Sequence, residues 1–103
     1  MQLVSIDHIP GQELEVLGIV KGTIVHSKSF GKDFMAAMKT LVGGEITAYT
    51  QMLNEARAIA TKRMVDEAEA LGADAVVNVR YGSAAVMQNA AEVIAYGTAV
   101  KFK

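Results

Sequence analysis

The sequence contains no cysteine, and this absence excludes several kinds of site at once. Without thiols the chain cannot build a disulfide framework, a cysteine-based zinc finger, an iron–sulfur site or a thiolate nucleophile. No apolar run approaches the roughly 20 residues that a membrane-spanning helix needs. The N-terminus also lacks the basic and apolar regions of a signal peptide. A soluble, cytoplasmic protein is the simplest interpretation.

An excess of charge of one sign is also missing. Ten basic residues oppose eleven acidic ones, which gives a net charge of −1. A chain so close to neutral offers no broad electrostatic attraction for nucleic acid or for anionic lipid. Neither a nucleic acid nor a membrane is therefore expected as a partner.

Apolar residues, in contrast, make up 51% of the chain, against 20% that are charged. A chain of 103 residues has room for one domain, residues 1–103, and a domain of this size leaves much of its surface exposed. The surplus of apolar side chains therefore predicts that some of them are buried between subunits.

The N-terminal quarter of the chain has the pattern of β structure. Residues Leu3–Ile6 form a candidate first strand, and Ile9–Gln12 is predicted to be a tight turn. Residues Leu14–His26 are predicted to form a strand with two apolar faces, both of them covered. Gly18 and Gly22 interrupt this strand and predict a bulge or the close approach of a neighbouring backbone.

Two helices are predicted in the middle of the chain. A short one spans Asp33–Val42 and ends at Gly43-Gly44, and a long one runs from Ile46 or Thr47 to about Leu71, with Gly72 as its stop. Ion pairs at i,i+4 spacing are expected on the long helix for Lys62–Asp66 and Arg63–Glu67. The apolar stripe of the long helix comprises Tyr49, Met52, Leu53, Ala56, Ile59 or Ala60, Met64, Ala68 and Leu71.

The C-terminal third predicts two more strands, Ala75–Tyr81 and Glu92–Phe102, joined by a connection of small residues over Gly82–Ala91. In the first strand, Val76, Asn78 and Arg80 are expected on one face, and Ala75, Val77, Val79 and Tyr81 on the other. In the last strand, one face carries small residues that suit a closely packed helix. The opposite face carries Ile94, Tyr96, Thr98, Val100 and Phe102.

The larger face of the last strand needs another cover, which is the main sequence argument for an oligomer. Together these elements predict an α+β fold, in which an antiparallel sheet is covered on one face by the long helix and the short helix.

Metal binding is the first candidate chemistry. His8 and His26 are the only imidazoles, and Asp7, Asp33 and Glu45 are possible oxygen ligands. Transition-metal sites need convergent ligands, and no spacing typical of such a site occurs here. No metal ligands are therefore assigned within one chain, although a site shared between subunits stays open.

Nucleotide binding and catalysis have weaker support. Gly43-Gly44 precedes a helix but lacks the Lys-Ser/Thr pair of a phosphate-binding loop. His26, Ser27 and Ser29 are neighbours in the sequence, yet a triad requires convergence in space and a third, orienting group. No catalytic residue is assigned, and an enzyme is the less favoured interpretation.

Arg57, Asn78 and Arg80 are the candidate ligand-binding residues. An arginine and an asparagine on an apolar strand offer hydrogen bonds to a ligand held between subunits. The competing interpretation, which is favoured, pairs Arg80 with an acidic residue of the helix or of a neighbouring chain.

Motifs that carry a family resemblance extend over nearly the whole chain. They include Gly18-Ile-Val-Lys-Gly22, Leu41-Val-Gly-Gly-Glu45, Leu71-Gly-Ala-Asp-Ala-Val-Val-Asn-Val-Arg80 and Glu92-Val-Ile-Ala-Tyr-Gly-Thr-Ala-Val100. These motifs are similar to those of the YbjQ family of small bacterial proteins, and the match is poorest at His26–Lys32. The resemblance implies a dodecin-like two-layer subunit that assembles into a ring, expected to be a homopentamer, and it brings a heavy-metal-binding label.

Three functions stay open at this point. The favoured one is a non-enzymatic homo-oligomeric module that binds a small ligand, a metal ion or a partner protein. The second is a metal-binding or metal-response protein, and the third is an enzyme whose site lies between subunits. No cofactor is assigned.

Overall fold

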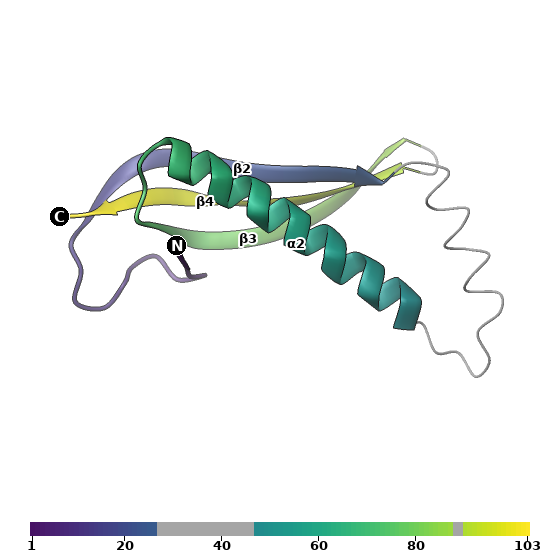
Figure 1. Cartoon of the computed structure of the whole chain (residues 1–103), viewed down its shortest axis with the longest axis horizontal. Coiled ribbons are helices and arrows are strands. Elements are labelled where there is room, and N and C mark those ends of the chain that lie inside the picture. Colours follow the sequence, from purple (N-terminus) through teal and green to yellow (C-terminus); the bar gives the residue numbers. More distant parts are fainter. Residues whose placement is uncertain (27–46, 88–89) are drawn as a thin grey trace.

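The computed structural model describes residues 1–26, 47–87 and 90–103 (Figure 1). Its described part contains strand β1 (Gln2–Leu3), strand β2 (Leu14–His26), helix α2 (Thr47–Ala70), strand β3 (Ala75–Met87) and strand β4 (Ala90–Phe102). The predicted short helix Asp33–Val42 and its glycine stop lie outside the described residues. Helix α2 runs across one face of the sheet, so the chain has two layers (Figure 1).

The sheet has the strand order β1-β3-β4-β2. Strands β2 and β3 each pair with β4 in antiparallel fashion, whereas β1 pairs in parallel with the start of β3, through Gln2↔Ala75 and Leu3↔Val76. The α+β class is thus confirmed. The expectation of an antiparallel sheet needs one correction, because the short β1 makes the sheet mixed.

The two glycines of β2 have the two roles that their positions predict. The pairing of β2 with β4 shifts between Val16 and Gly18, and Gly18 has a φ of +142°, so a bulge lies there. Gly22 lies directly under α2: a Cβ at this position would overlap the carbonyl oxygen of Ala60 and the amide nitrogen of Met64. The helix therefore rests on the backbone of β2.

The buried face of α2 is narrower than the predicted stripe. Ala56, Ala60, Met64 and Ala68 are buried against the sheet. Of the two alternatives at one turn, Ala60 is the buried residue, and Ile59 keeps 39% of its surface exposed. Leu71 was predicted to lie in the stripe, but it lies beyond the last helical residue and is 49% exposed. Small side chains thus allow the close contact with Gly22.

Helix α2 ends in a Schellman motif. The amide of Ala73 donates to the carbonyl of Ala68 at 3.1 Å, and the amide of Gly72 donates to the carbonyl of Glu69 at 2.9 Å. Gly72 has a φ of +78°, the left-handed conformation that this motif requires. The prediction that Gly72 terminates the helix is confirmed.

Strand β3 contains a bulge that the alternation of its residues does not predict. Its pairing with β4 shifts between Val77 and Arg80, and Asn78 adopts a φ of +54°. The extra residue reverses the alternation, so Val79 joins Val76 in the core under α2, while Arg80 pairs with Tyr96. The predicted division of faces in this strand was therefore wrong from Asn78 onward.

The predicted connection over Gly82–Ala91 is also corrected. Strand β3 continues to Met87 and β4 begins at Ala90, with cross-strand pairs such as Ser83↔Val93 and Ala85↔Ala91. Pairing with a long neighbouring strand overrides the weak strand preference of these small residues.

The core lies in two places. The larger cluster fills the space between α2 and the sheet and includes Val20, Met64, Val76 and Ala99. The smaller cluster lies on the opposite side of the sheet, where Ile9 of the N-terminal segment covers Ala75, Val77 and Val100. The turn before β2 supports this segment, because the Gln12 amide donates to the Ile9 carbonyl at 3.0 Å, as the predicted turn requires.

Candidate functional site: the open face of the sheet

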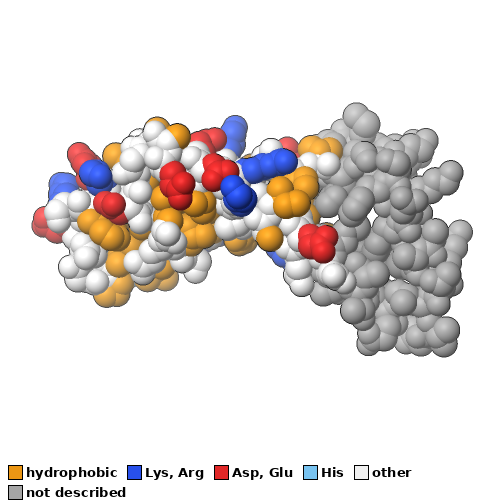
Figure 2. Space-filling model, viewed as in Figure 1, with side chains coloured by type: hydrophobic (Ala, Val, Ile, Leu, Met, Phe, Trp, Pro, Cys, Tyr) orange, Lys and Arg blue, Asp and Glu red, His pale blue; other side chains and the backbone are white. Residues whose placement is uncertain are grey.

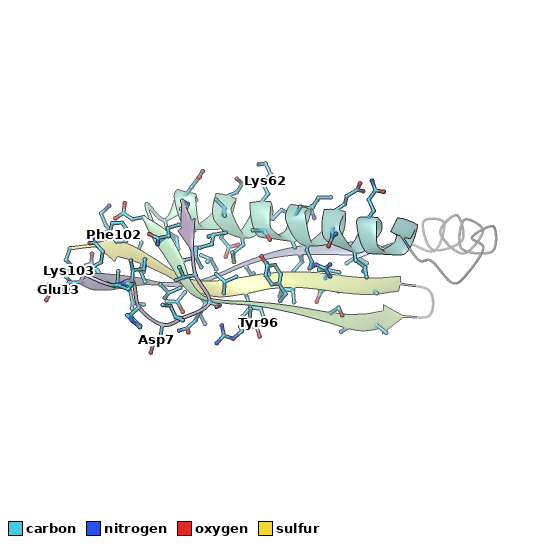
Figure 3. The ribbon with its side chains drawn as sticks, turned by 90° about the horizontal axis from the view of Figure 1, so that it is seen from below. Asp7, Glu13, Lys62, Tyr96, Phe102 and Lys103 are labelled. Carbon is cyan, nitrogen blue, oxygen red and sulfur yellow. The ribbon has the colours of Figure 1, made fainter. Side chains whose placement is uncertain are left out.

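The face of the sheet opposite α2 carries the largest exposed apolar side chains of β2. Ile19 is 80% exposed, Val16 69% and Val25 53%, and Tyr96 on the adjacent β4 is 41% exposed. We call these four residues the open face. Figure 3 shows Tyr96 on the side of the sheet that faces away from α2.

The pairing of β2 with β4 places these side chains together. Ile19 lies opposite Thr98 and Lys21 lies opposite Tyr96, and paired residues point to the same side of a sheet. The bulge at Gly18 brings Ile19 to this side, although strict alternation from Val16 would point it toward the helix. Ile19 and Tyr96 are thus diagonal neighbours on this side of the sheet, and Val25 lies farther along β2, beyond Lys21 and Thr23.

The N-terminal segment covers only one end of this side. Its contacts reach Val100 and Ala75, together with the partly buried Leu14 and Phe102. Beyond that corner the described residues leave Ile19, Val25 and Tyr96 exposed. The sequence predicts a cover for the face of β4 that carries the larger side chains. Within the described residues, the N-terminal segment covers one end of that face.

The opposite side of the molecule has a different character. Figure 2 shows the side that carries α2, where basic and acidic side chains are interspersed over the helix. One such pair is Lys62–Asp66, whose charged atoms lie 3.1 Å apart, as predicted. A helix surface of this kind is well suited to water, whereas the open face is not.

Two of the predicted ligand-binding residues hold the N-terminal segment in place. The guanidinium of Arg80 donates to the carbonyl of Ser5 at 2.7 Å and to its neighbour Val79 at 3.0 Å. The backbone amide of Asn78 donates to the carbonyl of Ile6 at 2.8 Å. The predicted acidic partner of Arg80 is therefore replaced, within the described chain, by backbone carbonyl groups.

The third candidate, Arg57, lies on the other layer. Its guanidinium donates to the side-chain oxygen of Asn54 at 2.6 Å on the exposed side of α2. The structure does not bring Arg57 together with Asn78 and Arg80, because the sheet lies between them. The signal that would have separated them is the bulge at Asn78, which alternation alone does not reveal.

Two of the metal-ligand candidates have side chains that the structure describes, Asp7 and His8. His8 and Asp7 are adjacent and exposed, with 2.9 Å between Nδ1 and Oδ1, and this hydrogen bond and the charge of the imidazole lower the pKa of Asp7. Among residues 1–26, 47–87 and 90–103, no three His, Cys, Asp or Glu side chains lie close enough together to hold a metal ion. Asp33 and Glu45 lie outside these ranges.

No helix in the part of the chain that the structure describes is both long and apolar enough to cross a membrane.

The fold and the open face together define a class: a two-layer α+β protein with a helix on one side of a mixed sheet and exposed apolar side chains on the other. All of the chain, residues 1–103, matches a family model described as "Putative heavy-metal-binding". The chain belongs to this family, YbjQ, as its motifs predict.

Relatives support the same assignment. The chain is 63% identical to a UPF0145 protein of Alkaliphilus metalliredigens, with 99% of each chain covered. It is 61% identical to a UPF0145 protein of Clostridium novyi, with 98% of each chain covered.

A solved structure from Pediococcus pentosaceus is similar to the whole fold. It is a protein of unknown function from the DUF74 family, it superposes with a TM-score of 0.69, and the match covers 100% of this chain and 98% of the other. At 17% sequence identity this likeness concerns the fold alone.

Proposed function

We propose that the protein is a non-enzymatic, homo-oligomeric module, and that its subunits associate through the open face and bind a small ligand or a partner protein at the surfaces so formed. The observation that carries this proposal is the exposure of Ile19, Val16, Val25 and Tyr96 on one side of the sheet. Large apolar side chains gathered on one exposed side of a sheet are poorly solvated, and such surfaces are typical of interaction sites.

The chemistry of the open face favours another protein surface as its cover. Branched aliphatic side chains and a tyrosine are flanked by Lys21 and Arg80, and apolar centres with aromatic and arginine residues are enriched in interfaces. The residues are carried on two paired strands, so they are already ordered before association, which lowers the entropic cost of binding.

We further propose a ring of five subunits, which is the number that the family resemblance implies. In a ring, each interface joins two different patches, so the open face of one subunit would meet a different surface of the next. A homopentamer would have five times the 11.0 kDa mass of one chain.

Sedimentation equilibrium of the tag-free protein at micromolar concentration tests the association. We expect a species of pentamer mass in the wild type and dissociation in Ile19→Lys, because a lysine in the centre of an apolar interface buries an unpaired charge. The matched control is Ile59→Lys, which makes the same change on the exposed side of α2. A monomeric wild type, or an Ile19→Lys variant that keeps the wild-type mass, would refute the proposal.

Arg57 is the remaining candidate for a ligand contact, because it is exposed on α2 and its guanidinium donates, among the described hydrogen bonds, to its neighbour Asn54 alone. A thermal-shift screen against metabolites and metal ions identifies the class of ligand, since a ligand at 100 times its Kd stabilises a protein by about 2.7 kcal/mol. If the thermal shift caused by a ligand is lost in Arg57→Ala but kept in Lys62→Ala, the ligand binds at Arg57.

The second candidate function is metal binding, which rests on the description of the family model. Imidazoles would be the strongest ligands in a chain without thiols. Titration calorimetry with zinc and copper separates the two functions: we expect weak, non-stoichiometric heats that disappear in the double variant His8→Ala, His26→Ala. Stoichiometric binding with a sub-micromolar Kd would favour the metal function instead.

An enzyme with a site between subunits is the third alternative, and a substrate found in the same thermal-shift screen would revive it. The proposal also places the protein in the cytoplasm, which cell fractionation tests.

A further inference from the structure

The outer edge of β2 carries an arrangement that the proposed function does not use. In the sheet formed by the described residues, β2 is an edge strand that pairs with β4, so one row of its backbone groups points away from the sheet. Lys21 and Thr23 lie in the middle of this row. Unpaired edge groups are a ready template for an additional strand from another chain.

Two side chains of α2 form hydrogen bonds with the backbone groups of this edge. The backbone amide of Lys21 donates to Oε1 of Glu67 at 3.2 Å. The guanidinium of Arg63 donates to the backbone carbonyl of Thr23 at 2.5 Å. One donor and one acceptor of the edge, two residues apart, are therefore both engaged by charged partners from the helix.

These contacts replace the ion pair that the sequence predicts. Arg63 and Glu67 have the same i,i+4 spacing as Lys62 and Asp66, but in the described part of the chain they reach down to β2 rather than pair with each other. The contact of α2 with Gly22, which lies between Lys21 and Thr23, holds the helix directly over this stretch. The lateral position of the helix thus determines which edge groups the two side chains can reach.

We propose that Arg63 and Glu67 form an edge cap, which closes the centre of the outer edge of β2 to an extended strand of a second copy of this chain. The cap directs association to the open face and away from edge-to-edge pairing, which would continue the sheet into larger assemblies. This inference deepens the proposed function, because it names the surface through which copies do not join.

Native-state hydrogen exchange at the Lys21 amide tests the first half of the proposal. In Glu67→Ala we expect exchange at this amide to rise by about tenfold, since the amide loses a charge-assisted hydrogen bond and faces water. Glu67→Gln keeps an acceptor oxygen without the charge, so its exchange rate should lie between those of the wild type and Glu67→Ala. An unchanged rate in Glu67→Ala would overturn the proposal, because the amide would then have another partner.

Sedimentation velocity tests the second half. The double variant Arg63→Ala, Glu67→Ala should form species larger than the wild type in amounts that grow with concentration. The matched control is Lys62→Ala, Asp66→Ala, which removes one basic and one acidic residue at the same spacing; this pair points away from the sheet, as Lys62 does in Figure 3. If the double variant keeps the wild-type size distribution, the edge cap has no effect on association and the inference fails.

The two proposals fail in different ways. If the wild type is a monomer, association through the open face is refuted, but hydrogen exchange at the Lys21 amide still tests the edge cap. An unchanged exchange rate refutes the cap and leaves the mass of the wild type unaffected.

Discussion

The two faces of the sheet differ in burial, although the same strands form both of them: one face is a packed core and the other carries exposed apolar side chains. On the helix side, Val20, Met64 and Val76 are fully buried. On the other side, Ile19, the immediate neighbour of Val20, keeps 80% of its surface exposed. The difference does not come from composition, because both faces of β2 are largely apolar, but from how much of each face the described residues cover.

The closest contact on the helix side gives the largest expected effect. Gly22→Ala should destabilise the protein by at least about 3 kcal/mol, because its Cβ would overlap backbone atoms of Ala60 and Met64 that cannot move without the helix. Denaturant unfolding measures this loss. Gly82→Ala is the control, since its Cβ would lie 3.5 Å from Ile94 in ordinary contact, and we expect it to change stability by less than about 1 kcal/mol. Equal effects would show that α2 does not rest on β2 as described.

The second prediction compares the two faces directly. Met64→Ala should lower the free energy of unfolding by about 2–5 kcal/mol, because it leaves a cavity in the core. Ile19→Ala should cost less than about 0.5 kcal/mol in dilute, dissociated protein. If the open face is an interface, the cost of Ile19→Ala must grow with protein concentration, while that of Met64→Ala need not. Denaturant unfolding at several protein concentrations measures both costs. If the cost of Ile19→Ala does not change with concentration, the open face is not an interface.

The third prediction concerns the C-terminal end of α2, the helix that covers the buried face of the sheet. Gly72→Val should cost about 2 kcal/mol and Gly72→Ala about 1 kcal/mol, because both residues disfavour the φ of +78° and a β-branched residue does so more strongly. Thermal unfolding midpoints measure the order of the two effects. Negligible changes in both variants would mean that this glycine has ordinary helical or extended dihedrals.

The smallest expected effect lies at the exposed pair Asp7–His8. The hydrogen bond from His8, and then its charge, lower the pKa of Asp7 from its usual 3.8 in the folded protein. A lowered folded pKa means that the stabilisation is present above the unfolded pKa and is lost as the pH falls through the folded one. An NMR titration should therefore find the Asp7 pKa below 3.8 in the wild type and nearer to 3.8 in His8→Ala. Identical titration curves would show that the pair does not persist in solution.

Much of the fold could be predicted from local patterns. The bounds of β2 follow from a turn at one end and a largely apolar run, and the end of α2 follows from Gly72, because each of these signals acts over a few residues. The packing of α2 on the small face of β4, where Ala95 and Ala99 are buried, also followed from side-chain size. These features depend on nearby residues, so a single sequence contains them.

The rest depended on pairing between distant segments. The left-handed Asn78 inserts a residue into β3, and nothing in its neighbours marks it, so Arg80 and Val79 were assigned to the wrong faces. The stretch Gly82–Met87 is poor in strand-forming residues and continues β3 because β4 lies beside it. The candidate residues of the site were misplaced for the same reason, since their faces depend on the register.

The parallel pairing of β1 with β3 has a consequence for the order of events during synthesis. Arg80 donates to the carbonyl of Ser5 across 75 residues of chain, and the ribosome adds about 5–20 residues per second. The N-terminal segment therefore waits about 4–15 s before its partner strand exists, with Val4 and Ile9 exposed to water and to other nascent chains. This segment is made before its partner strands, and the corner that it covers can pack only after β3 and the end of β4 have been synthesised.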